Sequence, residues 1–270
     1  MDIRDVQAID VHAHYGQYIR DGFDPLTCEL MSGDAATVAQ RARDANVQWT
    51  VVSPLLGLLP RGRNDAIVGN EEAARLVPQT PGLLYWVIVD PLRPATYDQA
   101  REMLQLPQCM GIKIHPEEHC YPISDHGDEL FAFAADQRAM VLAHSGNENS
   151  WPIDFIPFAN AHPEMSVILA HLGNSGSDVV ARDLQVRAVQ ASTQGNVYTD
   201  TSSSNSILPK LIEFGVRELG ADRLFFGTDT PLYYAPMQRA RVDFAEISDA
   251  DKHLILRGNA ERLLSLPSDK

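Results

Sequence analysis

Eight apolar, strand-like runs recur along the 270-residue chain, each followed by a stretch with helical periodicity. Most runs are continuously apolar rather than alternating, which is typical of parallel strands that are buried on both faces. In chain order they are QAIDVHA, WTVVSP, LLYWVIVDP, CMGIKIHP, MVLAHS, MSVILAHLG, NVYTDTS and RLFFGTDTP. Eight such units in series, with no break in composition between them, predict a (β/α)8 TIM barrel that occupies residues 1–270 as a single domain.

The stretches between the runs predict the outer helices. They cover residues 32–47, 70–77, 96–106, 128–138, 153–162, 178–192, 207–219 and 253–266, and Ser32 or Asp34 can cap the first of them. An open, doubly wound sheet is the alternative architecture. The longest irregular segments, residues 15–33, 55–63 and 117–126, all follow strands. In a barrel they would be loops at the carboxyl-terminal mouth, where enzymes of this fold work.

Histidine and aspartate residues lie where several of these runs end. They are His12, His14, His144, His171 and Asp229. Strand alternation puts His12 and His14 on one face about 7 Å apart, with Asp10 on the same face as an acceptor for an imidazole N–H. Imidazole and carboxylate are ordinary ligands of divalent first-row metals. Because a closed barrel gathers its strand ends at one rim, the pattern predicts a metal site there.

Composition limits the remaining functional classes. The net charge of −14 argues against a broad nucleic-acid footprint, and three cysteines without a CxxC pair argue against a disulfide framework. No apolar run approaches the roughly 20 residues of a membrane span, and the N-terminus has no secretory pattern. We therefore expect a cytoplasmic protein that acts on a small-molecule substrate, with no nucleic-acid or membrane partner. Whether it forms a homo-oligomer stays open.

Further candidates follow the second, fourth and fifth runs. Lys113 and His115 share one face of GIKIHP, so they look into the barrel if the isoleucines meet the helices. Arg61 and Arg63 suit a substrate carboxylate through bidentate pairing, although solvated loop charges are the alternative. Trp151 follows His144 closely and either walls the substrate pocket or packs in the core. All five residues are candidates for binding substrate.

The ordered motifs resemble the amidohydrolase superfamily, and most closely its amidohydrolase family 2 branch, which includes aminocarboxymuconate-semialdehyde decarboxylase. The motifs are HxH after the first strand, His after the fifth and sixth, Asp after the eighth, and a terminal GNAERLL. The resemblance covers essentially the whole chain and implies a (β/α)8 barrel with one divalent metal, often zinc. It implies that the metal ligands are His12, His14, His144 and Asp229. It also implies proton-handling roles for His171 and Asp229.

Two questions remain open within this resemblance. Binuclear relatives have a carboxylated lysine that bridges two ions, and Lys113 lies at the matching strand; we favour a paired, buried lysine and one ion. For function, we predict a metal-dependent hydrolase of a small organic ester, lactone or amide that uses metal-activated water. The alternative within the branch is a metal-dependent, non-oxidative decarboxylase of an aromatic or muconate-like acid. A metal-binding barrel without catalysis is the alternative outside enzymes.

Overall fold

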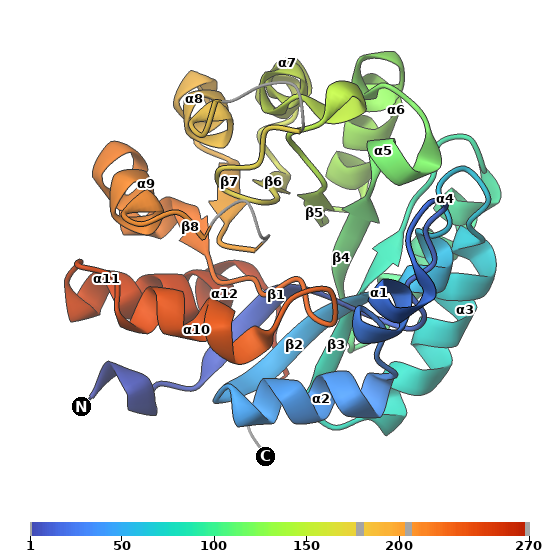
Figure 1. The fold of residues 1–270 in the computed structure, drawn as a ribbon. Coiled ribbons are helices and arrows are strands. Elements are labelled where there is room, and N and C mark those ends of the chain that lie inside the picture. The colour runs from blue at the N-terminus through green and yellow to red at the C-terminus, as the bar shows by residue number, and fades with distance from the viewer. Residues whose placement is uncertain (1, 177–180, 203–206, 268–270) are drawn as a thin grey trace.

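Eight parallel strands form the centre of the molecule, as Figure 1 shows. The computed structural model describes residues 2–176, 181–202 and 207–267. The strands are β1 (Ala8–Tyr15), β2 (Val47–Pro54), β3 (Leu83–Ile88), β4 (Cys109–Ile114), β5 (Met140–Ala143), β6 (Ser166–Leu169), β7 (Val197–Asp200) and β8 (Leu224–Phe225). Each strand pairs in parallel with the next one along the chain, in the order β1 to β8.

Backbone hydrogen bonds between β1 and the segment after β8 close the ring. The Val11 amide donates to the Phe226 carbonyl at 3.0 Å, and the Asp229 amide donates to the His12 carbonyl at 2.7 Å. The predicted (β/α)8 TIM barrel is therefore confirmed, and the open doubly wound sheet is wrong.

Helices surround the strands (Figure 1). They are α1 (Pro25–Leu30), α2 (Ala35–Asp44), α3 (Ala66–Leu76), α4 (Ala95–Met103), α5 (Pro116–His119), α6 (Ile123–Asp136), α7 (Ile156–Ala161), α8 (Leu184–Ala191), α9 (Leu211–Leu219), α10 (Ala235–Asp243), α11 (Asp249–His253) and α12 (Asn259–Leu263). A π-helical segment, η8 (Leu254–Gly258), joins α11 to α12. Within the described residues, none of these helices has both the length and the apolar character needed to cross a membrane.

The helix boundaries differ from the predicted ones in a few places. Asp34, not Ser32, caps α2, because its carboxylate accepts a hydrogen bond from the Thr37 amide. Of the helix predicted over 178–192, residues 178–180 lie outside the described residues and α8 begins at Leu184. The expected mouth loop 15–33 contains the short helix α1, and the expected loop 117–126 overlaps α5 and the beginning of α6.

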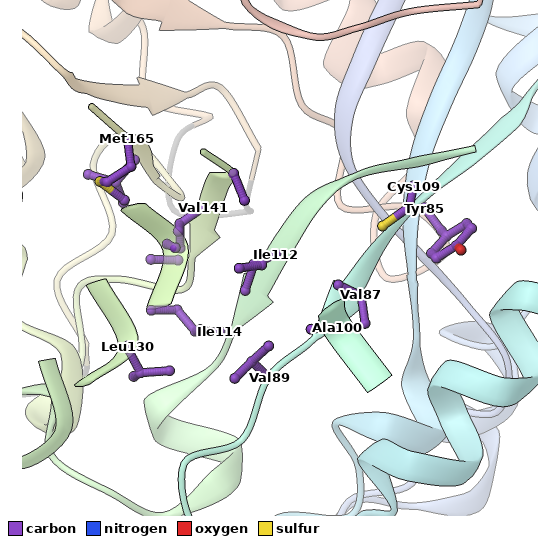
Figure 2. Packing of buried hydrophobic residues seen from close by; sticks show 14 of the residues in the cluster. Tyr85, Val87, Val89, Ala100, Cys109, Ile112, Ile114, Leu130, Val141 and Met165 are labelled. Carbon is purple, nitrogen blue, oxygen red and sulfur yellow. The ribbon is translucent and has the colours of Figure 1, made fainter. Parts of the chain in front are cut away.

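Two layers of packing hold the barrel and determine which side chains face the site. The outer layer lies between strands and helices, and Figure 2 shows Ile112 and Ile114 of β4 in the same buried cluster as Leu130 of α6. Because side chains alternate along a strand, Lys113 between the two isoleucines faces the barrel interior. This is the orientation that the sequence predicted for Lys113.

The inner layer fills the barrel below the mouth with large side chains. Trp86 is fully buried, and its indole N–H donates to the Val11 carbonyl at 2.8 Å. Gly111 of β4 lies directly against it with φ +152°, and a Cβ at Gly111 would come within 2.7 Å of the Trp86 ring. The same Cβ would also meet the Met140 carbonyl of β5. Only glycine therefore fits between the indole and the neighbouring strand.

We expect Gly111→Ala to destabilise the fold by roughly 3 kcal/mol, because it combines a rare backbone angle with overpacking. Urea unfolding monitored by circular dichroism measures the loss. The matched control is Gly22→Ala, where φ is +83° but nothing lies within 4 Å of the added Cβ. That control should lose only about 1–2 kcal/mol. Equal losses in the two variants would mean that the Trp86 contact does not constrain position 111.

Candidate metal centre

Two histidines and one aspartate place their donor atoms together at the mouth of the barrel. Nε2 of His14 lies 3.1 Å from Oδ1 of Asp229, and Nε2 of His12 lies 3.7 Å from the same oxygen. One donor atom from each of the three residues falls within 4.8 Å of the others, and all three residues are buried. The structure thus brings three of the residues predicted at the strand ends together as a group of donors that could hold one metal ion.

Hydrogen bonds fix the direction in which both imidazoles face. Nδ1 of His12 lies 2.8 Å from Oδ2 of Asp200, and Nδ1 of His14 lies 3.1 Å from the Ser53 carbonyl. A carboxylate and a carbonyl only accept, so each Nδ1 carries the hydrogen and each Nε2 presents its lone pair toward Asp229. Such partners orient metal-ligating histidines.

The protonation states of these residues suit a cation. Burial lowers the pKa of His12 to about 4, so the ring is neutral at pH 7. Burial alone would raise the pKa of Asp229, but its contacts with His14, His171 and His12 hold that pKa below its usual range. Two imidazoles and one carboxylate form an ordinary donor set for a divalent first-row ion. The residues therefore fit a metal.

His144, the fourth predicted ligand, does not belong to the group of close donor atoms formed by His12, His14 and Asp229. Its Nδ1 is 3.1 Å from Nε2 of His171, and its Nε2 is 2.8 Å from Oδ1 of Asn147. Its ring stacks on His115 with centroids 4.1 Å apart. The structure thus brings three of the four predicted ligands together and pairs His144 with His171. Ligation by His144 stays a prediction.

Asp200, at the end of β7, is a central residue that the sequence analysis did not select. Its carboxylate accepts hydrogen bonds from the His12 ring, from the His171 amide at 3.0 Å and from the Ser202 amide at 3.0 Å. Burial would raise the pKa of Asp200, but its histidine neighbours and the Ser202 hydroxyl hold it below its usual range. The run NVYTDTS has an aspartate followed by threonine near its end, as RLFFGTDTP does, so strand-end position could have revealed it.

A second group of close donor atoms, in His12, His171 and Asp200, is a supporting network instead of another metal site. Its atoms already hydrogen-bond one another or Ser202, whose Oγ lies 2.8 Å from Nδ1 of His171. Burial lowers the pKa of His171 to about 4. This network therefore holds two neutral histidine rings in fixed positions beside the three-ligand site.

Lys113 lies fully buried beside this site. Its Nζ is 3.0 Å from Nε2 of His12, and burial lowers the pKa of Lys113 to about 8. The ammonium therefore approaches the same lone pair that faces Asp229. This position agrees with a buried, hydrogen-bonded lysine.

A pocket of about 240 Å³ opens above the metal-site residues. The metal-site histidines and Asp229 line it, and so do Tyr18, Arg20, Arg61 and Glu118. Its aliphatic lining consists of Met31, Leu55, Leu58, Leu59 and Leu232. The pocket therefore offers both polar and apolar contacts to a small molecule.

The predicted substrate contacts divide into two groups. His115 and Arg61 line the pocket, whereas Lys113 lies beneath it. Arg63 does not line the pocket; its guanidinium pairs with Asp21 at 2.7 Å, and its side chain is 63% exposed. Trp151 lines a separate apolar hollow with Pro152 and Ile153, so its predicted place in the substrate pocket does not match this geometry.

Comparisons with known proteins agree with this architecture. Residues 9–266 match the family model for amidohydrolases. No curated protein matches the chain. The 2,6-dihydroxybenzoate decarboxylase from Rhizobium has a similar structure, with a TM-score of 0.71, 14% identity, and coverage of 95% of this chain and 98% of that one.

Two further solved structures share the fold. One is dihydroxybenzoic acid decarboxylase from Polaromonas sp. JS666 with bound manganese and the inhibitor 2-nitroresorcinol, with a TM-score of 0.71, 14% identity and coverage of 95% and 96%. The other is 5-carboxyvanillate decarboxylase from Sphingomonas paucimobilis, with a TM-score of 0.71, 12% identity and coverage of 97% and 99%. At these identities the likeness establishes the fold.

We expect Asp200→Asn to weaken the binding of Mn²⁺ by about 10- to 100-fold, because His12 loses the carboxylate that orients its ring. Equilibrium dialysis with elemental analysis measures the affinity. Asp98→Asn is the control, since Asp98 lies on α4 with its side chain 81% exposed. Wild-type affinity in Asp200→Asn would show that the carboxylate does not prepare His12 for the metal.

Proposed function

The chain belongs to the amidohydrolase family, and we propose that it is a metal-dependent decarboxylase of a small aromatic or muconate-like carboxylic acid. The observation that carries the proposal is the buried His12, His14 and Asp229 donor set, which lines a pocket of about 240 Å³. Three similar structures are decarboxylases of aromatic acids, which favours this reaction over the hydrolysis that the sequence alone placed first. Membership of an enzyme family also argues against a barrel that only binds metal.

We propose one divalent ion, held by His12, His14 and Asp229, with His144 as a further ligand. Zinc follows from the sequence resemblance, whereas the Polaromonas enzyme contains manganese, and nitrogen and oxygen donors suit both. Lys113 lies beside this site, with its Nζ 3.0 Å from Nε2 of His12, and a second ion bridged by a carboxylated Lys113 is the alternative to the single ion. When bound, the ion supplies positive charge that stabilises electrons gathering on substrate oxygens.

The chain's own residues must manage one proton. Loss of CO₂ breaks a carbon–carbon bond, and the ring carbon that keeps the electron pair takes up one proton. We assign this transfer to His171 and Asp229, which both line the pocket. His171 is neutral at pH 7, and its two nitrogens lie within hydrogen-bond distance of His144 and Ser202. A neutral imidazole in this position can accept a proton at one nitrogen and donate one at the other.

Hydrolysis of a small ester, lactone or amide is the second candidate, because the family description itself is that of amidohydrolases. The same donor set can activate water for attack on a carbonyl. The two reactions differ in their products, which makes them straightforward to separate.

Protein loaded with Mn²⁺ or with Zn²⁺ should release one CO₂ for each hydroxybenzoate consumed, with no oxidant present. Liquid chromatography of the phenol product and trapping of CO₂ provide the measurement, and metal-free protein is the control. A parallel panel of lactones and aryl esters tests hydrolysis. Turnover of that panel without CO₂ release from any acid would contradict the decarboxylase proposal.

We expect His171→Ala to keep its bound metal while its rate falls by about 10²–10⁴, the usual effect of losing a positioned acid or base. His12→Ala should lose metal and activity together, because a ligand is missing. Elemental analysis of both variants, followed by rates at saturating metal, distinguishes the two roles. Equal metal loss in both variants would assign His171 to ligation instead of proton transfer.

A further inference from the structure

The His12 ring has one lone pair, and two groups require it. Nδ1 of His12 donates its hydrogen to Asp200, so the neutral ring keeps its lone pair on Nε2. This nitrogen lies 3.7 Å from Oδ1 of Asp229, which belongs to the same proposed ligand set. It also lies 3.0 Å from Nζ of Lys113. Because an ammonium group only donates, Lys113 uses the lone pair that a metal ion would need.

Contacts on several sides hold the His12 ring in this orientation. Its Nδ1 lies 2.8 Å from the Asp200 carboxylate. The ring also stacks on His171 with centroids 4.8 Å apart and meets the His14 ring edge-on at 5.4 Å. The imidazole cannot turn away from Lys113 without losing these contacts. Lysine has a flexible four-carbon stem, so the amine is the partner that can move.

Lys113 is placed to act on His12 and not on a molecule in the pocket. Its side chain is fully buried, and it is not among the residues that line the pocket in the described part of the chain. Its backbone is fixed in the centre of the sheet, where it pairs in register with Ile88 of β3 and Leu142 of β5. The strand therefore holds the amine next to one particular ligand.

The amine also changes the charge that an incoming cation meets. The carboxylates of Asp200 and Asp229 both lie close enough to favour the charged form of Lys113. The two carboxylates with the ammonium group have one net negative charge, whereas the carboxylates alone have two. A divalent ion is therefore attracted more weakly while Lys113 is present.

We propose that Lys113 is an internal competitor of the metal ion. Its amine holds the lone pair of His12 until a divalent cation displaces it, and so lowers the affinity of the site for metal. The inference rests on the part of the proposed function in which His12 is a ligand. Competition of this kind makes metal binding reversible, so that occupancy follows the supply of metal. A carboxylated Lys113 would have the opposite effect, because it would add a ligand.

The test compares the metal affinity of the wild type with that of Lys113→Met and Lys113→Gln. Equilibrium dialysis of metal-free protein against Mn²⁺, followed by elemental analysis, gives the dissociation constants without any substrate. We expect both variants to bind Mn²⁺ at least about tenfold more tightly, because the lone pair is free and a like charge is gone. The rise in melting temperature at a fixed Mn²⁺ concentration should also be larger in the variants.

Lys252→Met is the matched control. Lys252 is another buried lysine, but its Nζ donates to the Asp243 carbonyl at 2.8 Å, away from the pocket lining. This variant should bind Mn²⁺ as the wild type does, and thermal unfolding checks that every variant folds. Equal or weaker Mn²⁺ binding by a folded Lys113→Met or Lys113→Gln protein would overturn the proposal.

A second measurement uses the wild type alone. Carboxylation of a lysine consumes CO₂, so a carboxylated Lys113 would make Mn²⁺ binding tighter when bicarbonate is added. We expect the same affinity with and without bicarbonate, and an increase would contradict competition by a free amine. Neither measurement needs turnover. Tighter binding by the variants therefore supports the proposal even if no acid releases CO₂, whereas CO₂ release with unchanged variant affinity rejects only the competition.

Discussion

The hydrogen bond from the Asp229 amide to the His12 carbonyl is the contact on which the site depends. It joins the first strand to the turn after the last, and so brings together ligands from opposite ends of the chain. Asp10 strengthens the same junction between β1 and the turn after β8. Its carboxylate accepts hydrogen bonds from the Thr228 amide at 3.0 Å and from the Thr228 hydroxyl at 2.6 Å. Burial raises the pKa of Asp10 to about 7. The carboxylate predicted to support an imidazole instead supports the backbone that carries both ligands.

Strand-end residues were predictable because a barrel imposes one geometry on all of them. The alternation of β1 places His12 and His14 on one face, and closure places Asp229 opposite them, so the sequence pattern was sufficient for these three. Exact pairings were not predictable. The His144 ring pairs with the His171 ring, and His171 has a left-handed backbone conformation, with φ +71°, in the turn after β6. The apolar pattern of the strands does not encode this conformation, so it does not predict where the His171 ring points.

The loops were the least predictable part of the site. Arg61 and Arg63 are separated by one residue and have similar sequence surroundings, yet one lines the pocket and the other pairs with Asp21. Trp151 follows a strand-end histidine but turns to a different hollow. Partner choice in such segments depends on residues far away in sequence, such as Glu118, which local patterns do not reveal.

The lining of the pocket rests on two kinds of backbone. His12 and His14 belong to a strand that is hydrogen-bonded along both edges, whereas Arg20 and Arg61 belong to irregular segments linked by one ion-paired glutamate. Mutations in these segments can therefore alter the loop-borne lining while the strand network keeps the donor atoms in place. In evolutionary terms, the chemistry and the choice of substrate can diverge separately. A family built on this barrel can keep one reaction centre while its members acquire different acids.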